Sequence, residues 1–320
     1  MATEFDLIRR YFNRPAKNAV LGVGDDCALW SPGVGMLQAA STDMLIEGRH
    51  FLAGTDAEKL GRKSLAVNLS DLAAMGADPR YALLAIALPG ADEKWLEAFA
   101  RGFFAQADRH GVELIGGDTT RGQLAISITV IGEVPLALAL RRDAALAGDE
   151  VWLSGATGGA ALALAHQEGR VSLDWRDLQE CLARLDDPEP RVELGGRLRG
   201  IARAAIDISD GLLADLGHIA ECSGVGIDIA ADRLPVIGAL RDCSDEALRW
   251  QCIAAGGDDY ELAFTAPRTQ HAALDRIGEE LGLALTAIGS VIPGEPVVTL
   301  RDSAGMPIKM ARTGYDHFDA

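Results

Sequence analysis

Strand-like and helix-like segments alternate along almost the whole sequence, and this alternation restricts the possible folds more than any other feature. The apolar runs 81–88, 124–133 and 151–154 have the length and composition of buried strands. The stretch 92–110 has amphipathic helical spacing and ends at Gly111. Because repeated alternation of this kind is typical of α/β proteins, we predict an α/β fold of the α+β type.

The length and one weak stretch in the pattern predict two domains. The chain has 320 residues, of which 48% are apolar, and globular domains commonly contain roughly 100–200 residues. Between residues 135 and 148 the pattern fades into a connection that contains Arg141, Arg142 and Asp143. We place the boundary there, which gives domains 1–140 and 141–320.

Three local patterns predict one further strand and the starts of two helices. The segment 20–30 is predicted to be a strand. Thr55 and Glu58 have the spacing of a capping box, in which a hydroxyl and a carboxylate satisfy backbone N–H groups at the start of a helix. Ser209 or Asp210 is predicted to cap the helix that follows them.

The chain is strongly acidic, with 30 Lys and Arg residues against 47 Asp and Glu residues and a formal charge of −17 at pH 7. Proteins that bind nucleic acid or anionic membrane surfaces do so largely through Lys and Arg. We therefore expect neither nucleic acid nor a membrane as a partner. A chain of this charge needs metal cations if it is to bind phosphate groups.

The sequence also predicts a cytoplasmic location. Its longest apolar stretches, such as 81–88, are far shorter than the roughly 18–20 residues of a transmembrane helix. The N-terminus carries Glu4 and Asp6 and no apolar signal-peptide core. The five cysteines form no C-x-x-C pair, which argues against a disulfide framework and a zinc site.

Six short polar runs stand out because each contains Asp and lies at the predicted end of a strand or on a helix beside one. The P-loop, the dinucleotide-binding loop and the zinc-protease and serine-hydrolase motifs are absent. The runs are GVGDD (22–26), STD (41–43), NLSD (68–71), GGDTTRG (116–122), DISDG (207–211) and GGDDY (256–260).

Carboxylates gathered in this way repel one another unless cations neutralise them. Oxygen ligands favour Mg²⁺, Mn²⁺ or Ca²⁺, and Mg²⁺ commonly joins a few carboxylates to substrate phosphates. Neighbouring glycines let backbone N–H groups approach a phosphate. Each run alone also fits an ordinary turn or a solvated helix face. Taken together, the six runs predict a phosphoryl-transfer site that uses ATP and several Mg²⁺ ions.

Seven segments resemble the bacterial thiamine-monophosphate kinase family, which belongs to the aminoimidazole ribonucleotide synthetase-like superfamily. They are GVGDDCAL (22–29), STDMLIEGRHF (41–51), NLSDLAAMGADP (68–79), GGDTTRG (116–122), DISDGLLADLGHI (207–219), GGDDYEL (256–262) and GYDHF (314–318). The resemblance implies a two-domain aminoimidazole ribonucleotide synthetase-like fold. It also implies a homodimer that pairs the sheets of its N-terminal domains, which bind ATP and metal.

The resemblance further implies the reaction, which is the last step of thiamine diphosphate biosynthesis. The γ-phosphoryl group of ATP would pass directly, in line and with Mg²⁺ assistance, to thiamine monophosphate. No residue would act as a general base, because a phosphate acceptor with a second pKa of about 6 is already largely ionised at neutral pH.

The family's site residues fall on defined positions of this chain. The implied metal ligands are Asp26, Ser41 or Thr42, Asp43, Asp71, Asp118, Asp207 and Asp210. The implied ATP contacts are Gly117, Asp118, Arg142 and Ser209. The implied substrate contacts are His50, Asp258 and Tyr315.

Two positions leave questions within this assignment. Asp258 stands where many relatives are expected to have Glu, and its shorter side chain raises the question of whether it contacts substrate directly. Arg141 is adjacent to Arg142, so either could contact ATP. A carboxylate and an aromatic ring, as Asp258 and Tyr315 provide, suit a substrate with a cationic thiazolium and a flat pyrimidine.

Two other functions remain open at this point. A superfamily sister would use ATP to activate an amide, a carbamoyl group or selenide. Selenophosphate synthesis requires a reactive Cys or selenocysteine in a mobile Gly-rich segment, whereas Cys27 directly follows a pair of Asp residues. A non-catalytic regulator that binds divalent cations or nucleotides is the alternative from another functional class.

Overall fold

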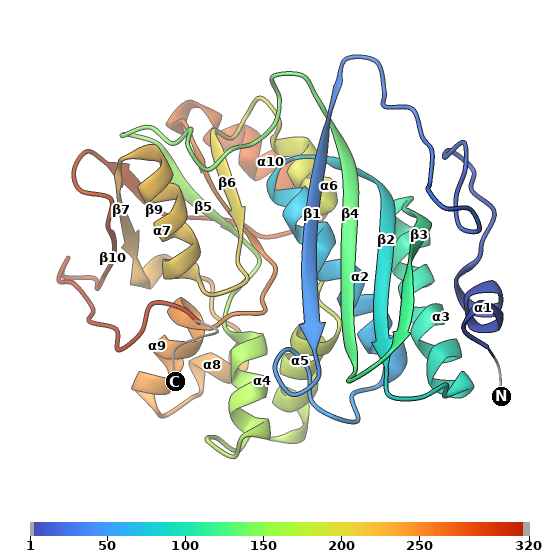
Figure 1. Ribbon diagram of the computed structural model, residues 1–320. Coiled ribbons are helices and arrows are strands. Elements are labelled where there is room, and N and C mark those ends of the chain that lie inside the picture. The colour runs from blue at the N-terminus through green and yellow to red at the C-terminus, as the bar shows by residue number, and fades with distance from the viewer. Residues whose placement is uncertain (1–2, 316–320) are drawn as a thin grey trace. The chain divides into compact units, whose positions relative to one another are not determined.

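The computed structural model describes residues 3–315 and contains two compact units, each with its own sheet (Figure 1). The first unit comprises the chain up to Leu72 together with Ala77–Ala137. The second unit comprises Ala73–Gly76 and the chain from Leu138 onward. Both sheets are accompanied by helices, so the predicted mixed α/β class is confirmed.

The first unit is built on a four-stranded sheet with the order β1-β4-β2-β3. β2 and β3 are parallel, and the other neighbours are antiparallel. Helices α2 and α3 lie against one face of this sheet (Figure 1). The elements are α1 (Glu4–Leu7), β1 (Met36–Ile46), α2 (Ala57–Ala74), β2 (Asp78–Leu88), α3 (Glu93–His110), β3 (Glu113–Arg121) and β4 (Ala125–Pro135).

Two glycines allow α2 and α3 to pack with their backbones in contact. A Cβ atom at Gly61 of α2 would lie 2.1 Å from the carbonyl oxygen of Phe99. A Cβ atom at Gly102 of α3 would lie 1.8 Å from the carbonyl oxygen of Glu58. Any larger residue would separate the helices and loosen the core beneath them, which contains Phe99 and Phe103 with no exposed surface.

The prediction of a strand at 20–30 is wrong. The segment forms only isolated bridges, between Leu21 and Leu29 and between Val23 and Asp25. Gly24, with φ +120°, interrupts extended pairing. The segment packs instead through Trp30, whose ring centroid lies 5.5 Å from that of Tyr81 on β2.

The predicted capping box is also wrong, by one residue. The Thr55 hydroxyl donates to the carbonyl oxygen of Leu52. Asp56 caps α2 instead, because its Oδ1 accepts the backbone N–H of Lys59 at 2.9 Å. An Asp beside a Thr is an alternative N-cap, and residue spacing alone does not show which of the two caps the helix.

The second unit has a six-stranded sheet with the order β10-β7-β9-β5-β8-β6. Only β10 and β7 are parallel neighbours. Its strands are β5 (Glu150–Ser154), β6 (Ala204–Asp207), β7 (Gly226–Ala230), β8 (Leu262–Ala266), β9 (Leu285–Ile292) and β10 (Val298–Arg301). Its helices are α4 (Gly159–Gln167), α5 (Trp175–Asp186), α6 (Val192–Leu198), α7 (Leu212–Ser223), α8 (Gly238–Arg241), α9 (Glu246–Ala255) and α10 (His271–Leu281).

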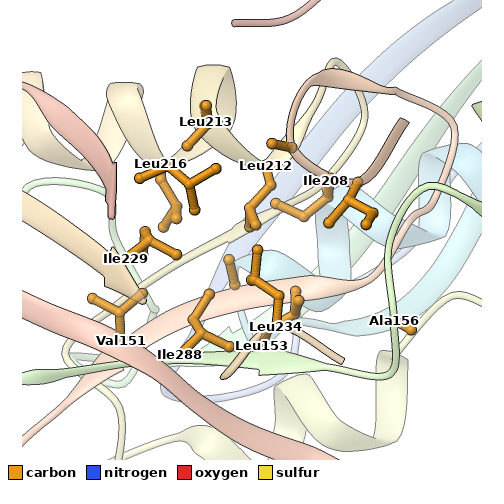
Figure 2. Close-up of a cluster of buried hydrophobic side chains, with 14 of the residues drawn as sticks. Val151, Leu153, Ala156, Ile208, Leu212, Leu213, Leu216, Ile229, Leu234 and Ile288 are labelled. Carbon is orange, nitrogen blue, oxygen red and sulfur yellow. The ribbon is translucent and has the colours of Figure 1, made fainter. Parts of the chain in front are cut away.

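The apolar face of α7 joins this helix to the sheet of the second unit. Figure 2 shows Leu212 and Leu216 directed toward Leu153, Ile229 and Ile288 of the sheet. All five side chains are buried. This packing holds the N-terminus of α7 beside the end of β6, where the acidic run 207–211 lies. Within residues 3–315, no helix has the length and apolar character needed to span a membrane.

We expect the substitution Gly102→Ala to destabilise the first unit by about 1–3 kcal/mol, the usual cost of inserting a methyl group into a packed contact. Gly217→Ala in α7 is the matched control, because nothing lies within 4 Å of a Cβ atom there and Ala favours helix more than Gly. Thermal unfolding followed by circular dichroism measures both. Equal midpoints for Gly102→Ala and the unaltered protein would contradict the close helix contact.

Candidate functional site

The first unit brings Ser41, Asp43 and Asp71 together between β1 and α2. The Ser41 hydroxyl donates to Oδ2 of Asp71 at 2.5 Å. The backbone N–H of Asp43 donates to Oδ1 of Asn68 at 3.0 Å. Asn68 is itself held by donating to the carbonyl oxygen of Ser64 at 3.0 Å. Two acidic runs that are far apart in sequence therefore meet in one place.

The alternation of side chains along β1 separates Ser41 from Thr42. Ser41 pairs with Val130 of β4, whose side chain is buried. Thr42 pairs with Thr129, and the two hydroxyls contact each other. Because neighbouring strand residues point to opposite faces of a sheet, Ser41 faces α2 and Asp71 whereas Thr42 faces away.

Asp118 and Asp43 lie on opposite faces of the same sheet. Asp118 pairs with Ala85 of β2, which in turn pairs with Ser127 of β4. Asp43 pairs with Ile128, the residue that follows Ser127. The first unit by itself therefore does not bring Asp118 to the cluster of Ser41, Asp43 and Asp71.

Two polar runs lie inside strands, and the prediction that they lie at strand ends is wrong. The run 41–43 lies within β1, and 116–118 lies within β3. Backbone pairing between β2 and β3 continues as far as Arg121. Gly117 has φ +148°, and a Cβ atom there would lie 1.8 Å from the carbonyl oxygen of Leu84. The glycine therefore keeps the strand paired where a larger residue would break it.

Asp26 and His50 lie in turns of the first unit. Asp26 is exposed, and its backbone N–H donates to Oδ1 of Asp25 at 2.8 Å. The Nδ1 atom of His50 accepts the backbone N–H of Ile46 at 3.0 Å. This contact places the proton of a neutral imidazole on Nε2 and orients the ring at the end of β1.

In the second unit, one carboxylate organises the turn between β6 and α7. Asp207 ends β6 and is 4% exposed. Oδ2 of Asp215 accepts the backbone N–H groups of Ser209, Asp210 and Gly211 at 3.0, 3.1 and 3.0 Å. The prediction that Ser209 or Asp210 caps α7 is wrong, because neither side chain caps it.

Asp215 lies in the first turn of α7 and is 3% exposed. Burial raises the pKa of its carboxyl to about 7, against the opposing effect of the Gly211 N–H, and the charge of Asp210 adds to the increase. We did not predict this residue from the sequence. The available signal was a single acid in the otherwise apolar stretch LLADLGHI (212–219).

The turn 209–211 also holds the other predicted residues of this unit. Its Ser209 carbonyl oxygen accepts the backbone N–H of Asp258 at 2.9 Å. Its Asp210 carbonyl oxygen accepts the backbone N–H of Tyr315 at 2.9 Å. A Cβ atom at Gly257 would lie 2.3 Å from the Ser209 oxygen, so a glycine is needed for this approach. Residues 316–318 of the GYDHF run lie outside the described residues.

Two buried acidic residues of the loop 256–261, Asp259 and Glu261, join the loop to distant segments of the second unit. Oδ2 of Asp259 accepts the backbone N–H of Gly158 at 2.7 Å, and burial raises the pKa of Asp259 well above its usual value. Glu261 accepts two hydrogen bonds from Arg191, at 2.5 and 2.7 Å, and a third from the Ser154 hydroxyl at 2.5 Å. Sequence reasoning also missed these contacts, because their partners lie far apart in the chain.

The two neighbouring arginines differ in their contacts. Arg141 forms an ion pair with Asp143, with Nε 2.7 Å from the carboxylate. Arg142 is exposed, and within residues 3–315 its guanidinium makes no hydrogen bond to the protein. Arg142 is therefore the one whose guanidinium can meet an incoming anion without breaking an existing ion pair.

No three His, Cys, Asp or Glu side chains in the described part of the chain form a ready-made metal cage. The oxygen donors present suit Mg²⁺, which usually keeps several waters and takes only one or two carboxylates together with substrate phosphates. The residues therefore fit a Mg²⁺ ion whose coordination is completed by a phosphate ligand.

Comparisons with known proteins give one consistent result. Residues 24–134 match the family model "AIR synthase related protein, N-terminal domain". Thiamine-monophosphate kinase from Salmonella typhimurium is 44% identical over 322 residues, covering 98% of each chain. The crystal structure of thiamine-monophosphate kinase from Stenotrophomonas maltophilia K279a has a TM-score of 0.85 and 46% identity, and the match covers 94% of this chain and 95% of that one.

A third relative has ligands bound. The structure of AaThiL complexed with AMPPCP and TMP has a TM-score of 0.78 and 29% identity, and the match covers 90% of this chain and 89% of that one.

We expect Asp215→Ala to loosen the turn at the start of α7, because three N–H groups lose their common acceptor. The loss should lower the free energy of unfolding by about 1–3 kcal/mol. Hydrogen exchange followed by mass spectrometry should show faster exchange in peptides that cover 207–213. Glu221→Ala, at an exposed position of the same helix, is the control and should leave that exchange unchanged. Unaltered exchange in Asp215→Ala would contradict the role of the carboxylate.

Proposed function

The chain belongs to the thiamine-monophosphate kinase family, and from this membership we propose that it transfers the γ-phosphoryl group of ATP to thiamine monophosphate, giving ADP and thiamine diphosphate. The observation that carries the proposal is the 44% sequence identity to a thiamine-monophosphate kinase, which extends over 98% of this chain and 98% of that relative. The relative crystallised with AMPPCP and TMP, an ATP analogue and the proposed acceptor, supports the same pair of substrates.

The chemistry requires alignment and charge neutralisation more than proton transfer. Both reacting groups are phosphates, and the acceptor is largely ionised at neutral pH. Their mutual repulsion must be overcome before the transferred group and the acceptor oxygen can lie in line. A site made of oxygen ligands for cations suits this requirement.

We propose that several Mg²⁺ ions bind to the acidic residues. In the first unit, Ser41, Asp43 and Asp71 lie together and would provide one set of oxygen ligands. In the second unit, Asp207 precedes the turn 209–211 that Asp215 holds, and Asp210 lies within it. Asp26, Thr42 and Asp118 remain proposed ligands at separate positions. When bound, Mg²⁺ would neutralise phosphate charge.

We propose that four residues contact ATP, namely Gly117, Asp118, Arg142 and Ser209. Gly117 exposes backbone at β3 next to Asp118. Ser209 offers a hydroxyl at the turn before α7. Arg142 would bind a phosphate through its planar guanidinium, which can donate two parallel hydrogen bonds.

Thiamine monophosphate contacts are proposed from His50, Asp258 and Tyr315. The Nε2–H group of His50 can donate to a phosphate oxygen. The carboxylate of Asp258 offers a negative charge to the thiazolium. Tyr315, half exposed, offers an aromatic face.

We also propose that residues 1–140 form the ATP-binding, metal-binding and dimerisation domain, and that two chains pair their N-terminal sheets. β1 is at one end of the strand order of that sheet, so one of its edges is available for pairing. The cytoplasmic location stays a prediction.

The direct test is to incubate the protein with Mg²⁺, ATP and thiamine monophosphate and to measure thiamine diphosphate and ADP by chromatography. We expect the two products in equal amounts, because each transfer yields one of each. Omission of Mg²⁺ should abolish both products. ATP binding without thiamine diphosphate at any Mg²⁺ concentration would instead support the non-catalytic regulator.

Asp43→Asn tests the metal set of the first unit, because it removes a charge and keeps the shape of the side chain. We expect turnover to fall by about 100-fold or more, as when a group that stabilises charge in a transition state is lost. The Mg²⁺ concentration for half-maximal activity should rise, while the circular dichroism spectrum stays unchanged. Asp108→Asn, at an exposed ion pair on α3, is the control. Near-normal turnover in Asp43→Asn would remove Asp43 from the metal set.

A further inference from the structure

The loop that carries Asp258 has an unusual backbone. Asp258 and Tyr260 have φ angles of +67° and +50°, in the left-handed region that residues with a Cβ atom rarely adopt. In residues 3–315 the only other such residue that is not glycine is Ala137. Two left-handed residues on either side of Asp259 persist only where the surrounding structure determines the conformation.

Three hydrogen bonds, two between backbone groups and one from a backbone N–H to a carboxylate, hold it here. The N–H of Asp258 donates to the Ser209 carbonyl oxygen at 2.9 Å, and the N–H of Tyr260 donates to the Ile208 carbonyl oxygen at 2.8 Å. Between them, the Asp259 carboxylate accepts the N–H of Gly158 at 2.7 Å. The loop is therefore tied to the turn before α7 on one side and to the turn before α4 on the other.

This backbone brings the side chains of Asp258 and Tyr260 together. The Tyr260 hydroxyl donates to Oδ1 of Asp258 at 2.9 Å. Tyr260 is 8% exposed, so its ring is held by its surroundings and its hydroxyl has a defined position. A hydrogen bond from the hydroxyl of a buried tyrosine to one carboxylate oxygen favours one direction of the short Asp258 side chain.

We propose that Tyr260 is a positioning residue for substrate binding, which orients the Asp258 carboxylate toward the cationic thiazolium of thiamine monophosphate. This inference rests on the proposed function and extends it to a residue outside the predicted site. The tyrosine acts through the hydrogen bond to Asp258 and not by touching the substrate. Its effect should therefore appear in the binding of thiamine monophosphate and not in that of ATP.

Tyr260→Phe removes only the hydroxyl. We expect KM for thiamine monophosphate to rise about tenfold, the size expected when one hydrogen bond to a charged group is lost. The values of kcat and of KM for ATP should change by less than about twofold, because the metal and nucleotide residues keep their contacts. Tyr11→Phe is the matched control, since the Tyr11 hydroxyl also donates to a carboxylate, that of Glu93, at 3.2 Å on the surface of the first unit.

A double-mutant cycle separates positioning from a general structural role. If Tyr260 acts through Asp258, Tyr260→Phe should have no further effect on KM in a protein that already carries Asp258→Ala. Additive effects of the two substitutions would overturn the proposal. Equal increases in both KM values, together with a lower unfolding midpoint, would show a structural role and would overturn it as well.

Failure of the proposed function gives a different result. In that case the unaltered protein forms no thiamine diphosphate, and the inference fails with it. If the unaltered protein is active and Tyr260→Phe leaves KM for thiamine monophosphate unchanged, only the positioning role is refuted.

Discussion

Three backbone N–H groups at the start of α7 share one carboxylate oxygen of Asp215, and the candidate site of the second unit depends on this interaction. A buried amide that loses its acceptor is costly, so the turn 209–211 has little freedom to move. The same turn accepts N–H groups from Asp258 and Tyr315. Residues proposed for metal, nucleotide and substrate are thus held in place by hydrogen bonds to the backbone.

Acidic residues of a phosphate-binding site must be held near one another despite their repulsion. The first unit does this with neutral partners, since Ser41 donates to Asp71 and Asn68 accepts the N–H of Asp43. Negative charge at such a site is what a divalent cation would require, and the cation would in turn attract the phosphates of two anionic substrates.

Sequence patterns predicted regular elements well where one periodicity dominates. The helix predicted at 92–110 is α3 (Glu93–His110), and the strand predicted at 124–133 is β4 (Ala125–Pro135). Prediction failed where local signals compete. Asp56 and not Thr55 caps α2, and at α7 the N–H groups before the helix are bound by a carboxylate of its first turn, that of Asp215. Such choices depend on which donor a folded backbone presents, and residue spacing does not contain that information.

The sequence by itself determined the alternating architecture, the family and the residue types of the site, because periodicity and short motifs are local properties. Only the tertiary structure decided which of these residues meet. It joined Ser41 to Asp71 and placed Asp118 on the opposite face of the sheet through strand register. It also paired Tyr260 with Asp258 through a left-handed backbone held by distant carbonyl oxygens. Register and long-range hydrogen bonds arise only when separate segments pack together, so no local pattern could have predicted them.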